Sequence, residues 1–472
     1  MNTIFRPVLI LFVFFSAIFS SYAKIRLPEI IGSNMVLQRN TNVKIWGWAS
    51  PNEKISAKVS WISNAIKVVA NANGKWEFSV ATTLSKTPQK IHLNSAESDI
   101  DLTNILFGEV WVCSGQSNMR MPLKGYTGQP TFNGNMAIAK ASNFNLRLFS
   151  IKEMGSPKEL DSVIGYKKWE QSSSENAKDF SAVAFFYGKQ LQEILDVPVG
   201  LIMTSWGGTR IQPWISDETI GPLLENYKTK KDTTEHYKRI PSAIYNAMIH
   251  PIINYSIKGV LWYQGETNRD EPKVYEQLFP LMVKDWRKKW NIGDFPFYYV
   301  QIAPNNYTDK SNSQLLREVQ LVASQTIPNS GIAITADIGS DKTIHPPRKN
   351  EVAERLLFIA LNKSYGMKNV DCLGPIFKTM EEKEAALFLS FDNAETGLFC
   401  SKEELSGFEI AGEDKVFYPA KAEIIKGKQI KVSNETVKNP KAVRYGWSNW
   451  FEGSLYDNNM LPASSFRTDN WE

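Results

Sequence analysis

Histidine and cysteine are scarce in this chain of 472 residues, which has four of the first and three of the second. Neither residue recurs at the spacings that hold zinc, so we expect no metal site and no cofactor. Cys113, Cys372 and Cys400 form no disulfide framework, although Cys372 and Cys400 could pair in an oxidising compartment. The chain therefore offers few candidates for a catalytic histidine: His92, His236, His250 and His345.

The sequence also lacks basic runs interleaved with aromatic residues, and its formal net charge is only +5. After residue 23, no apolar stretch approaches the length of a membrane span. We therefore expect no nucleic-acid partner and no stable membrane insertion. With 43% hydrophobic residues, the chain has enough apolar side chains for about two or three cores, as a large globular enzyme requires.

The first residues have the pattern of a signal peptide. Met1–Arg6 is short and basic, and Pro7–Phe15 is apolar. Residues 21–23 supply the small side chains that a signal peptidase reads, which predicts a signal peptide over residues 1–23 and cleavage before Lys24. An uncleaved membrane anchor is the alternative. We expect a periplasmic or secreted protein.

Two segments that flank the middle of the chain have the pattern of β structure. Residues 24–105 contain short strands separated by turns, which predicts a β-sandwich. Within it, Asn73-Gly74 before the alternating run Lys75–Val80 is typical of a hairpin. Strand-like segments return in residues 369–472 and predict a second β-rich region.

In residues 106–368, strands alternate with helices such as Ser181–Leu195 and Leu315–Thr326, which predicts an α/β domain with a parallel sheet. Ser117 follows a predicted strand of this sheet. The apolar run Val110–Val112 stops abruptly, and Gly115 allows a sharp turn before the serine. Open α/β sheets bind ligands at this edge. A serine there can attack a carbonyl if a base takes its proton. An ordinary polar turn is the alternative, because serine and glycine are common in loops.

His345 is the best placed of the histidines to act as that base. It follows the apolar run Gly331–Asp337 and a short loop, and a helix is expected from about Asn350. This order puts His345 at the same sheet edge as Ser117. His250 instead ends an apparent helix, where the helix dipole favours a histidine.

Two further predicted strands end in polar residues. Val197–Met203 leads to Gly207-Gly208, whose backbone amides can approach a ligand closely. Gly259–Tyr263 leads directly to Gln264–Asn268. We predict an oxyanion hole formed by the N–H groups of Ser117 and Gly208, joined by the side chain of Gln264 or Asn268.

Taken together, these blocks resemble the ordered motifs of the sialate O-acetylesterase family, a carbohydrate-esterase branch of the SGNH hydrolases. The resemblance extends over nearly all of the chain after the signal peptide. It implies an SGNH-hydrolase-like, flavodoxin-like fold. It also implies an esterase that removes O-acetyl groups from sugars, most directly from sialic acid, with Ser117 as nucleophile and His345 as base. The matching segments are Gly115–Met119, Ser205–Thr209, Trp262–Glu266 and Ile344–Pro346.

The third catalytic residue is left open between several candidates. The resemblance to related carbohydrate esterases implies Glu266 of the Gln-Gly-Glu block. Asp341 lies four residues before the histidine, and Asp337 lies at the end of the preceding strand. A carboxylate at this position would hold the tautomer of His345, and we rank Glu266 first, Asp341 second and Asp337 third. A Ser–His dyad supported by a backbone carbonyl is the alternative.

Four residues near the motifs are predicted substrate contacts: Gln116, Trp206, Arg210 and Trp262. Arg210 could pair with a sialic acid carboxylate or make a structural salt bridge. The tryptophan rings could stack on a sugar or pack in the core. Acetylxylan or another acetylated polysaccharide is the alternative substrate class. A non-catalytic carbohydrate-binding protein is the alternative from another functional class.

Overall fold

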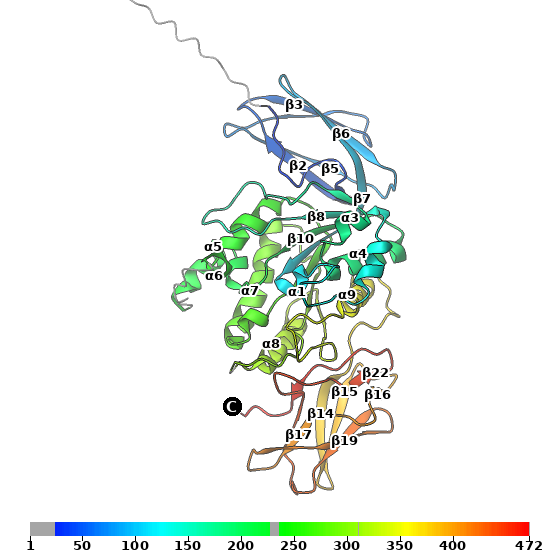
Figure 1. Ribbon diagram of the computed structural model, residues 1–472. Coiled ribbons are helices and arrows are strands. Elements are labelled where there is room, and N and C mark those ends of the chain that lie inside the picture. Colours follow the sequence, from blue (N-terminus) through cyan, green and yellow to red (C-terminus); the bar gives the residue numbers. More distant parts are fainter. Residues whose placement is uncertain (1–23, 227–235, 310, 472) are drawn as a thin grey trace, which may run out of the picture.

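The structure of the protein is a computed structural model that describes residues 24–226, 236–309 and 311–471. The molecule is elongated, with β structure at both ends and an α/β region between them (Figure 1). The predicted signal peptide, residues 1–23, lies outside the described residues. Within the described ranges, no helix combines the length and the apolar character needed to cross a membrane.

The α/β region is built on a sheet whose first strand lies in the middle. From that strand the chain proceeds first to one side and then to the other, which makes the sheet doubly wound. All neighbouring strands are parallel, apart from one short antiparallel strand at the edge. The predicted α/β class is therefore confirmed. The strands in spatial order are β9 (Glu170–Ser172), β8 (Asn143–Ser150), β10 (Val199–Ser205), β7 (Asp99–Gly115), β11 (Gly259–Tyr263), β12 (Phe297–Val300) and β13 (Ser330–Ala333).

Long helices cover both faces of this sheet. α4 (Ala182–Leu195) and α9 (Lys349–Lys363) pack together on one face, and α7 (Pro272–Trp290) and α8 (Ser313–Thr326) pack together on the other. Because both faces are covered, β10 and β11 are buried along their whole length. The predicted helices Ser181–Leu195 and Leu315–Thr326 are confirmed to within two residues.

The N-terminal region consists of two small sheets. β2 (Asn42–Trp48) pairs with β5 (Lys75–Ala81), whereas β3 (Lys54–Val59) pairs with β4 (Ile66–Val69) and with β6 (Gln89–Asn94). The predicted turn at Asn73-Gly74 forms, with a φ of +74° at the glycine. The hairpin pairing is wrong, because the strands on either side of the turn belong to different sheets.

β7 runs without interruption from the N-terminal region into the central sheet. Its first part pairs with β6, and its last part pairs with β10 and β11. β1 (Val36–Gln38) also pairs with it, in parallel. The domain boundary that we proposed between residues 105 and 106 therefore falls inside one strand. The strand that leads to Ser117 is thus hydrogen-bonded to strands of both regions.

The C-terminal region contains the remaining strands and packs against α8. Arg317 of α8 is buried, and its guanidinium donates to Gly446 O and to Ser465 Oγ, both at 3.1 Å. Cys372 and Cys400 are free thiols, so the disulfide left open above is not formed. The strands are β14 (Ile376–Lys383), β15 (Ala386–Asp392), β16 (Leu398–Cys400), β17 (Phe408–Ala411), β18 (Phe417–Pro419), β19 (Lys421–Ile425), β20 (Gln429–Ser433), β21 (Ala442–Tyr445), β22 (Leu455–Asp457) and β23 (Phe466–Arg467).

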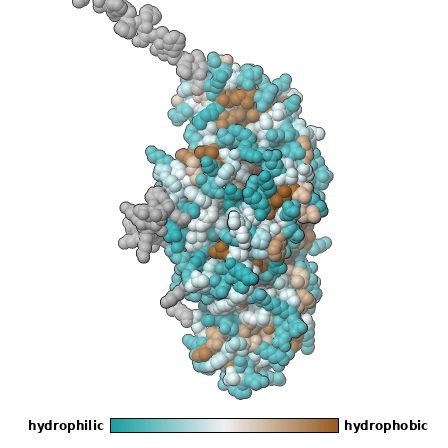
Figure 2. Space-filling model, in the orientation of Figure 1, coloured by the Kyte–Doolittle hydropathy of each residue, from teal (hydrophilic) through white to brown (hydrophobic). Residues whose placement is uncertain are grey.

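The surface on the face shown in Figure 2 is mostly polar. Its hydrophobic patches are small and separate from one another. Large contiguous apolar patches mark contacts with lipid or with other proteins.

Candidate active site

Ser117 and His345 meet at the C-terminal edge of the central sheet. Ser117 opens the short helix α1 (Ser117–Arg120), directly after β7 ends. Gly115 has a φ of +129°, and a Cβ there would lie 2.2 Å from Tyr263 O, so the turn before the serine requires glycine. Ser117 Oγ lies 2.7 Å from His345 Nε2, which suits transfer of the hydroxyl proton to the imidazole.

The other nitrogen of the imidazole faces Gln129. His345 Nδ1 lies 2.6 Å from Gln129 Oε1, which also accepts a hydrogen bond from Thr343 Oγ1 at 2.8 Å. An amide oxygen only accepts hydrogen bonds, so Nδ1 carries the proton and Nε2 is left to accept the serine hydroxyl. The ring of Tyr126 packs against the imidazole at 5.3 Å between centroids.

The three candidate acids lie elsewhere. Asn118 Nδ2 donates to the carboxylate of Glu266, and Asp337 forms an ion pair with Arg355 at 2.7 Å. Asp341 is exposed. We therefore correct the ranking of these acids as partners of the imidazole. The geometry fits the dyad alternative, except that the supporting oxygen comes from a side-chain amide and not from the backbone.

The imidazole of His345 is uncharged at neutral pH. Burial, together with the positive charge of the nearby Lys349, lowers its pKa to about 4. A neutral imidazole with a free Nε2 lone pair is the form that accepts a proton from serine.

A glycine pair lies beside the serine. A Cβ on Gly207 would stand 3.3 Å from the Cβ of Ser117, and the neighbouring Gly208 has a φ of +75°. Within the described part of the chain, no backbone carbonyl accepts the N–H of Ser117 or of Gly208. These two amides are therefore suited to receive an oxyanion.

The side chains of Gln264, Asn268 and Gln116 fasten loops together. Gln264 Nε2 donates to Asn268 Oδ1 at 2.8 Å and to Thr209 O at 3.1 Å, and both amide side chains are fully buried. Gln116 Oε1 accepts from Thr267 Oγ1 at 3.3 Å. We therefore correct the predicted oxyanion role of Gln264, because both hydrogens of its Nε2 are used within the protein. The oxyanion role of Asn268 and the substrate contact of Gln116 stay predictions, because these contacts engage the oxygen of each side chain.

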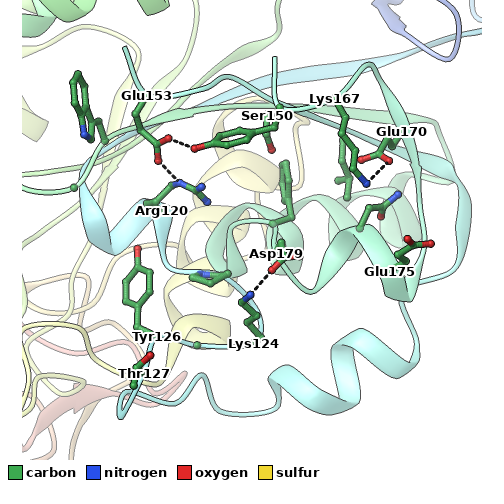
Figure 3. Close-up of a pocket in the computed structure, with 18 of the residues that line it drawn as sticks. Arg120, Lys124, Tyr126, Thr127, Ser150, Glu153, Lys167, Glu170, Glu175 and Asp179 are labelled. Carbon is green, nitrogen blue, oxygen red and sulfur yellow. Dashed lines mark hydrogen bonds and ion pairs between the residues drawn. The ribbon is translucent and has the colours of Figure 1, made fainter. Parts of the chain in front are cut away.

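A cavity of about 810 Å³ opens next to the serine and is lined by Tyr126, Trp206 and Gly207. Its wall is rich in charged side chains, most of them joined in pairs (Figure 3). A concave, polar pocket beside a candidate nucleophile suits a sugar substrate. The pairs are Arg120 with Glu153 at 2.7 Å, Lys124 with Asp179 at 2.6 Å and Lys167 with Glu170 at 3.1 Å.

Two predicted substrate contacts lie outside this cavity. Arg210 forms an ion pair with Asp270 at 3.0 Å, which is the structural alternative considered for it. Trp262 is fully buried and packs edge-on against Trp214, so it is a core residue and the prediction is corrected. Of the predicted contacts, Trp206 lies in the cavity wall.

A buried polar cluster lies behind the serine. Asn118 Oδ1 accepts a hydrogen bond from Lys349 Nζ, and Asn118 Nδ2 donates to Glu266 and, at 3.0 Å, to Ile344 O. All three side chains are buried. Burial raises the pKa of the Glu266 carboxyl and lowers the pKa of Lys349 to about 7. The cluster thus links the turn of the nucleophile to the loop of the histidine.

The segment from β7 to the start of α9 carries all these groups. A family model described as a sialic acid-specific acetylesterase, a carbohydrate esterase, matches residues 107–353. The chain belongs to this family. It is therefore a carboxylic-ester hydrolase, and the predicted resemblance is confirmed.

Relatives within the acetylesterase family match this chain over most of its length. The mouse sialate O-acetylesterase is 27% identical over 93% of this chain and 94% of its own. The human sialate O-acetylesterase is 29% identical over 75% of this chain and 74% of its own. A crystal structure of a carbohydrate acetylesterase from Xanthomonas citri is 31% identical, covers 95% of this chain and 100% of that chain, and has a TM-score of 0.86.

Sequence reasoning missed three residues of this acetylesterase site. Asn118 lies inside the Gly115–Met119 motif, but its buried contacts are not visible in a linear pattern. Lys349 is the first residue of a helix, and nothing in the linear pattern distinguishes it from a surface lysine. Gln129 lies in the loop after the nucleophile, which contains Gly125 and Gly128, and the sequence gives no other indication that Gln129 belongs to the site. Within the described residues, no group of three or more His, Cys, Asp or Glu is arranged to hold a metal ion.

Proposed function

We propose that this carbohydrate esterase is exported and removes O-acetyl groups from sugars, with Ser117 as nucleophile and His345 as general base. The observation that carries the proposal is the 2.7 Å approach of Ser117 Oγ to His345 Nε2. Their place at the edge of a parallel sheet, beside a polar cavity, supports it.

The reaction proceeds in two acyl-transfer steps. His345 takes the proton of Ser117 as Oγ attacks the acetyl carbonyl, and the N–H groups of Ser117 and Gly208 bind the oxyanion. A single donor of this kind contributes about 3 kcal/mol to transition-state stabilisation. The imidazolium then protonates the departing sugar oxygen and leaves an acetyl-serine. A water molecule, deprotonated by His345, attacks this ester and releases acetate.

Gln129 orients the imidazole, which is one of the two roles that the acid has in a triad. Its carbonyl oxygen accepts Nδ1–H and so holds the ring with Nε2 toward the serine. Being neutral, it adds no negative charge beside the imidazolium that forms during catalysis. The dyad therefore relies on the oxyanion donors and on positioning more than a triad does.

Acetylated sialic acid is the first substrate candidate, because the curated relatives in mouse and human are named sialate O-acetylesterases. In this proposal the ring of Trp206 contacts the sugar face. The acetyl group enters beside Gly207, where the serine and the cavity meet.

The charges of the cavity favour an acetylated neutral polysaccharide, such as xylan, as a second candidate. Lys168 of the cavity wall pairs with Glu29 at 2.7 Å, and Arg120, Lys124 and Lys167 pair with carboxylates as well. A cation that is already paired gains less from a sialic acid carboxylate than an open one does. A neutral sugar makes no demand on these pairs.

Acetate release from O-acetylated sialic acid and from acetylated xylan, measured side by side, tests the function. The wild-type protein is expected to release acetate from at least one substrate, and Ser117→Ala to release none above background. Release from neither substrate by folded wild-type protein contradicts both proposed substrate classes. Export is tested separately: protein recovered from outside the inner membrane should begin at Lys24.

A further inference from the structure

Lys349 is a buried lysine whose position is costly for the fold. Its side chain has no exposed surface, and the hydrogen bond of its Nζ goes to the neutral amide oxygen of Asn118. Nζ also lies 5.4 Å from the centre of the Tyr263 ring. Taking an ammonium group out of water costs free energy that one hydrogen bond to a neutral amide does not repay. Stability alone therefore does not account for this lysine.

The contacts of Asn118 connect Lys349 to the segments that carry Ser117 and His345. Asn118 directly follows Ser117 in α1, and its Nδ2 donates at 3.0 Å to Ile344 O, the carbonyl directly before His345. Its other contacts are Lys349 and the buried carboxyl of Glu266. A side-chain amide can accept and donate at once, so the ammonium polarises the amide that ties the serine turn to the histidine loop.

We propose that Lys349 is a positioning residue of the esterase reaction. Through Asn118 it holds the turn of Ser117 against the loop of His345, and it presents a positive charge to the imidazole. This inference rests on the proposed roles of Ser117 and His345. It assigns to Lys349 a function that requires both its hydrogen bond and its charge.

The groups that face Lys349 and His345 come from several elements. Glu266, from the short 3-10 helix Glu266–Asn268 after β11, is the acid nearest to Lys349, and its Oε2 has no hydrogen-bond partner among the described residues. The guanidinium of Arg269 and the hydroxyl of Tyr307 also interact electrostatically with that carboxyl. The remaining groups that face the two residues are Tyr263, Tyr126, Gln129, Thr343 and Ser117.

A positive charge near the imidazole opposes its protonation. The base therefore stays neutral, and the enzyme stays active, at pH values where an ordinary histidine is already charged. Burial and the Lys349 charge together bring the pKa of His345 to about 4. Removing the charge leaves only burial, so protonation of His345 should begin at higher pH.

The experiment is the pH profile of kcat/KM for acetate release by wild-type protein and by Lys349→Met, which keeps the length of the side chain without its charge. In the variant, the acidic limb should move to higher pH by about one unit. At pH 6, where Lys349 still carries its proton because its pKa is about 7, kcat should fall roughly tenfold while KM changes little, because a charge-assisted hydrogen bond away from the cavity is lost.

Lys363→Met is the matched control, because Lys363 lies at the other end of α9 and donates to Ser330 O at 2.7 Å. Its acidic limb should coincide with that of the wild type. If Lys349→Met does not fold, the double variant Lys349→Met/Glu266→Gln removes both buried charges, and its acidic limb should shift in the same direction.

An unchanged acidic limb in a folded variant overturns the inference. So does a wild-type limb near 6.5, the ordinary pKa of histidine, in place of one near 4. These results leave the esterase proposal standing, because that proposal depends on Ser117. If Ser117→Ala retains the wild-type rate, the esterase mechanism itself fails, whatever Lys349 does.

Discussion

Gln129 Oε1 lies 2.6 Å from His345 Nδ1, at the place that a carboxylate occupies in a serine–histidine–acid triad. The two residues are 216 positions apart in the sequence, and each belongs to a loop at the same edge of the sheet. The acceptor is neutral, so it holds the proton on Nδ1 and orients the ring without adding a negative charge that would stabilise the imidazolium.

Gln129→Ala should lower kcat roughly tenfold at pH 8, because the hydrogen bond that holds the ring and its tautomer is lost. Gln129→Glu should keep this hydrogen bond and add a negative charge, which raises the pKa of His345 and moves the acidic limb of kcat/KM to higher pH. A pH series of acetate release on both variants measures these effects. Wild-type behaviour of Gln129→Ala would remove Gln129 from the account.

Glu266→Gln should have little effect on turnover at pH 8, within about threefold, because its amide oxygen can still accept from Asn118 Nδ2. Asp341→Asn should have no measurable effect, since Asp341 is exposed and both nitrogens of the imidazole are hydrogen-bonded to other residues. The measurement is kcat for the two variants under identical conditions. A loss of several orders of magnitude in either variant would restore that acid as the third catalytic residue.

Gly207→Ala should slow acylation, because the new Cβ would stand 3.3 Å from the Ser117 Cβ and displace the nucleophile. The serine must give way by a few tenths of an ångström, so the loss should be smaller than the roughly hundredfold that a displacement of about 1 Å near the reacting atoms costs. Gly221→Ala is the control, since its nearest neighbour would lie at 3.9 Å. Burst kinetics with p-nitrophenyl acetate measure the acylation rate, and equal rates for the two alanine variants would contradict the predicted crowding.

The stability of the protein should rise with pH because of Lys349. Its pKa is about 7 in the folded protein, against an ordinary value of 10.5, so between these values the unfolded chain holds a proton that the folded protein has released. The free energy of unfolding therefore increases with pH across this window. Lys349→Met should flatten the increase. Urea unfolding of both proteins between pH 7 and 10 tests this, and parallel curves would contradict it.

The residues that follow strand ends could be predicted from the sequence, since an apolar run that stops at Ser117 or at Gly207 marks a sheet edge. The same logic located His345 between a strand and a helix. The predicted boundary at residue 105 differs from the structure for a physical reason: β7 continues as one strand through both regions.

The partners of those residues could not be predicted. Trp262 lies near the end of β11 and Gln264 directly follows it, which resembles the position of Ser117 after β7. Their side chains, however, are used in buried contacts. Gln129 approaches His345 only because two loops fold over the same edge. Which polar side chains bind each other is decided by packing in three dimensions, and a linear pattern does not contain that information.

The central claim, that Ser117 and His345 act as one unit, is tested most directly by a double-mutant cycle on kcat/KM for acetate release. Ser117→Ala and His345→Ala should each lower the rate by several orders of magnitude, and the double variant should be no slower than either. His250→Ala, which loses a contact with Glu159 at 3.3 Å outside the site, should stay near the wild-type rate. Losses that multiply in the double variant, or a near wild-type rate in a folded Ser117→Ala protein, would contradict the account.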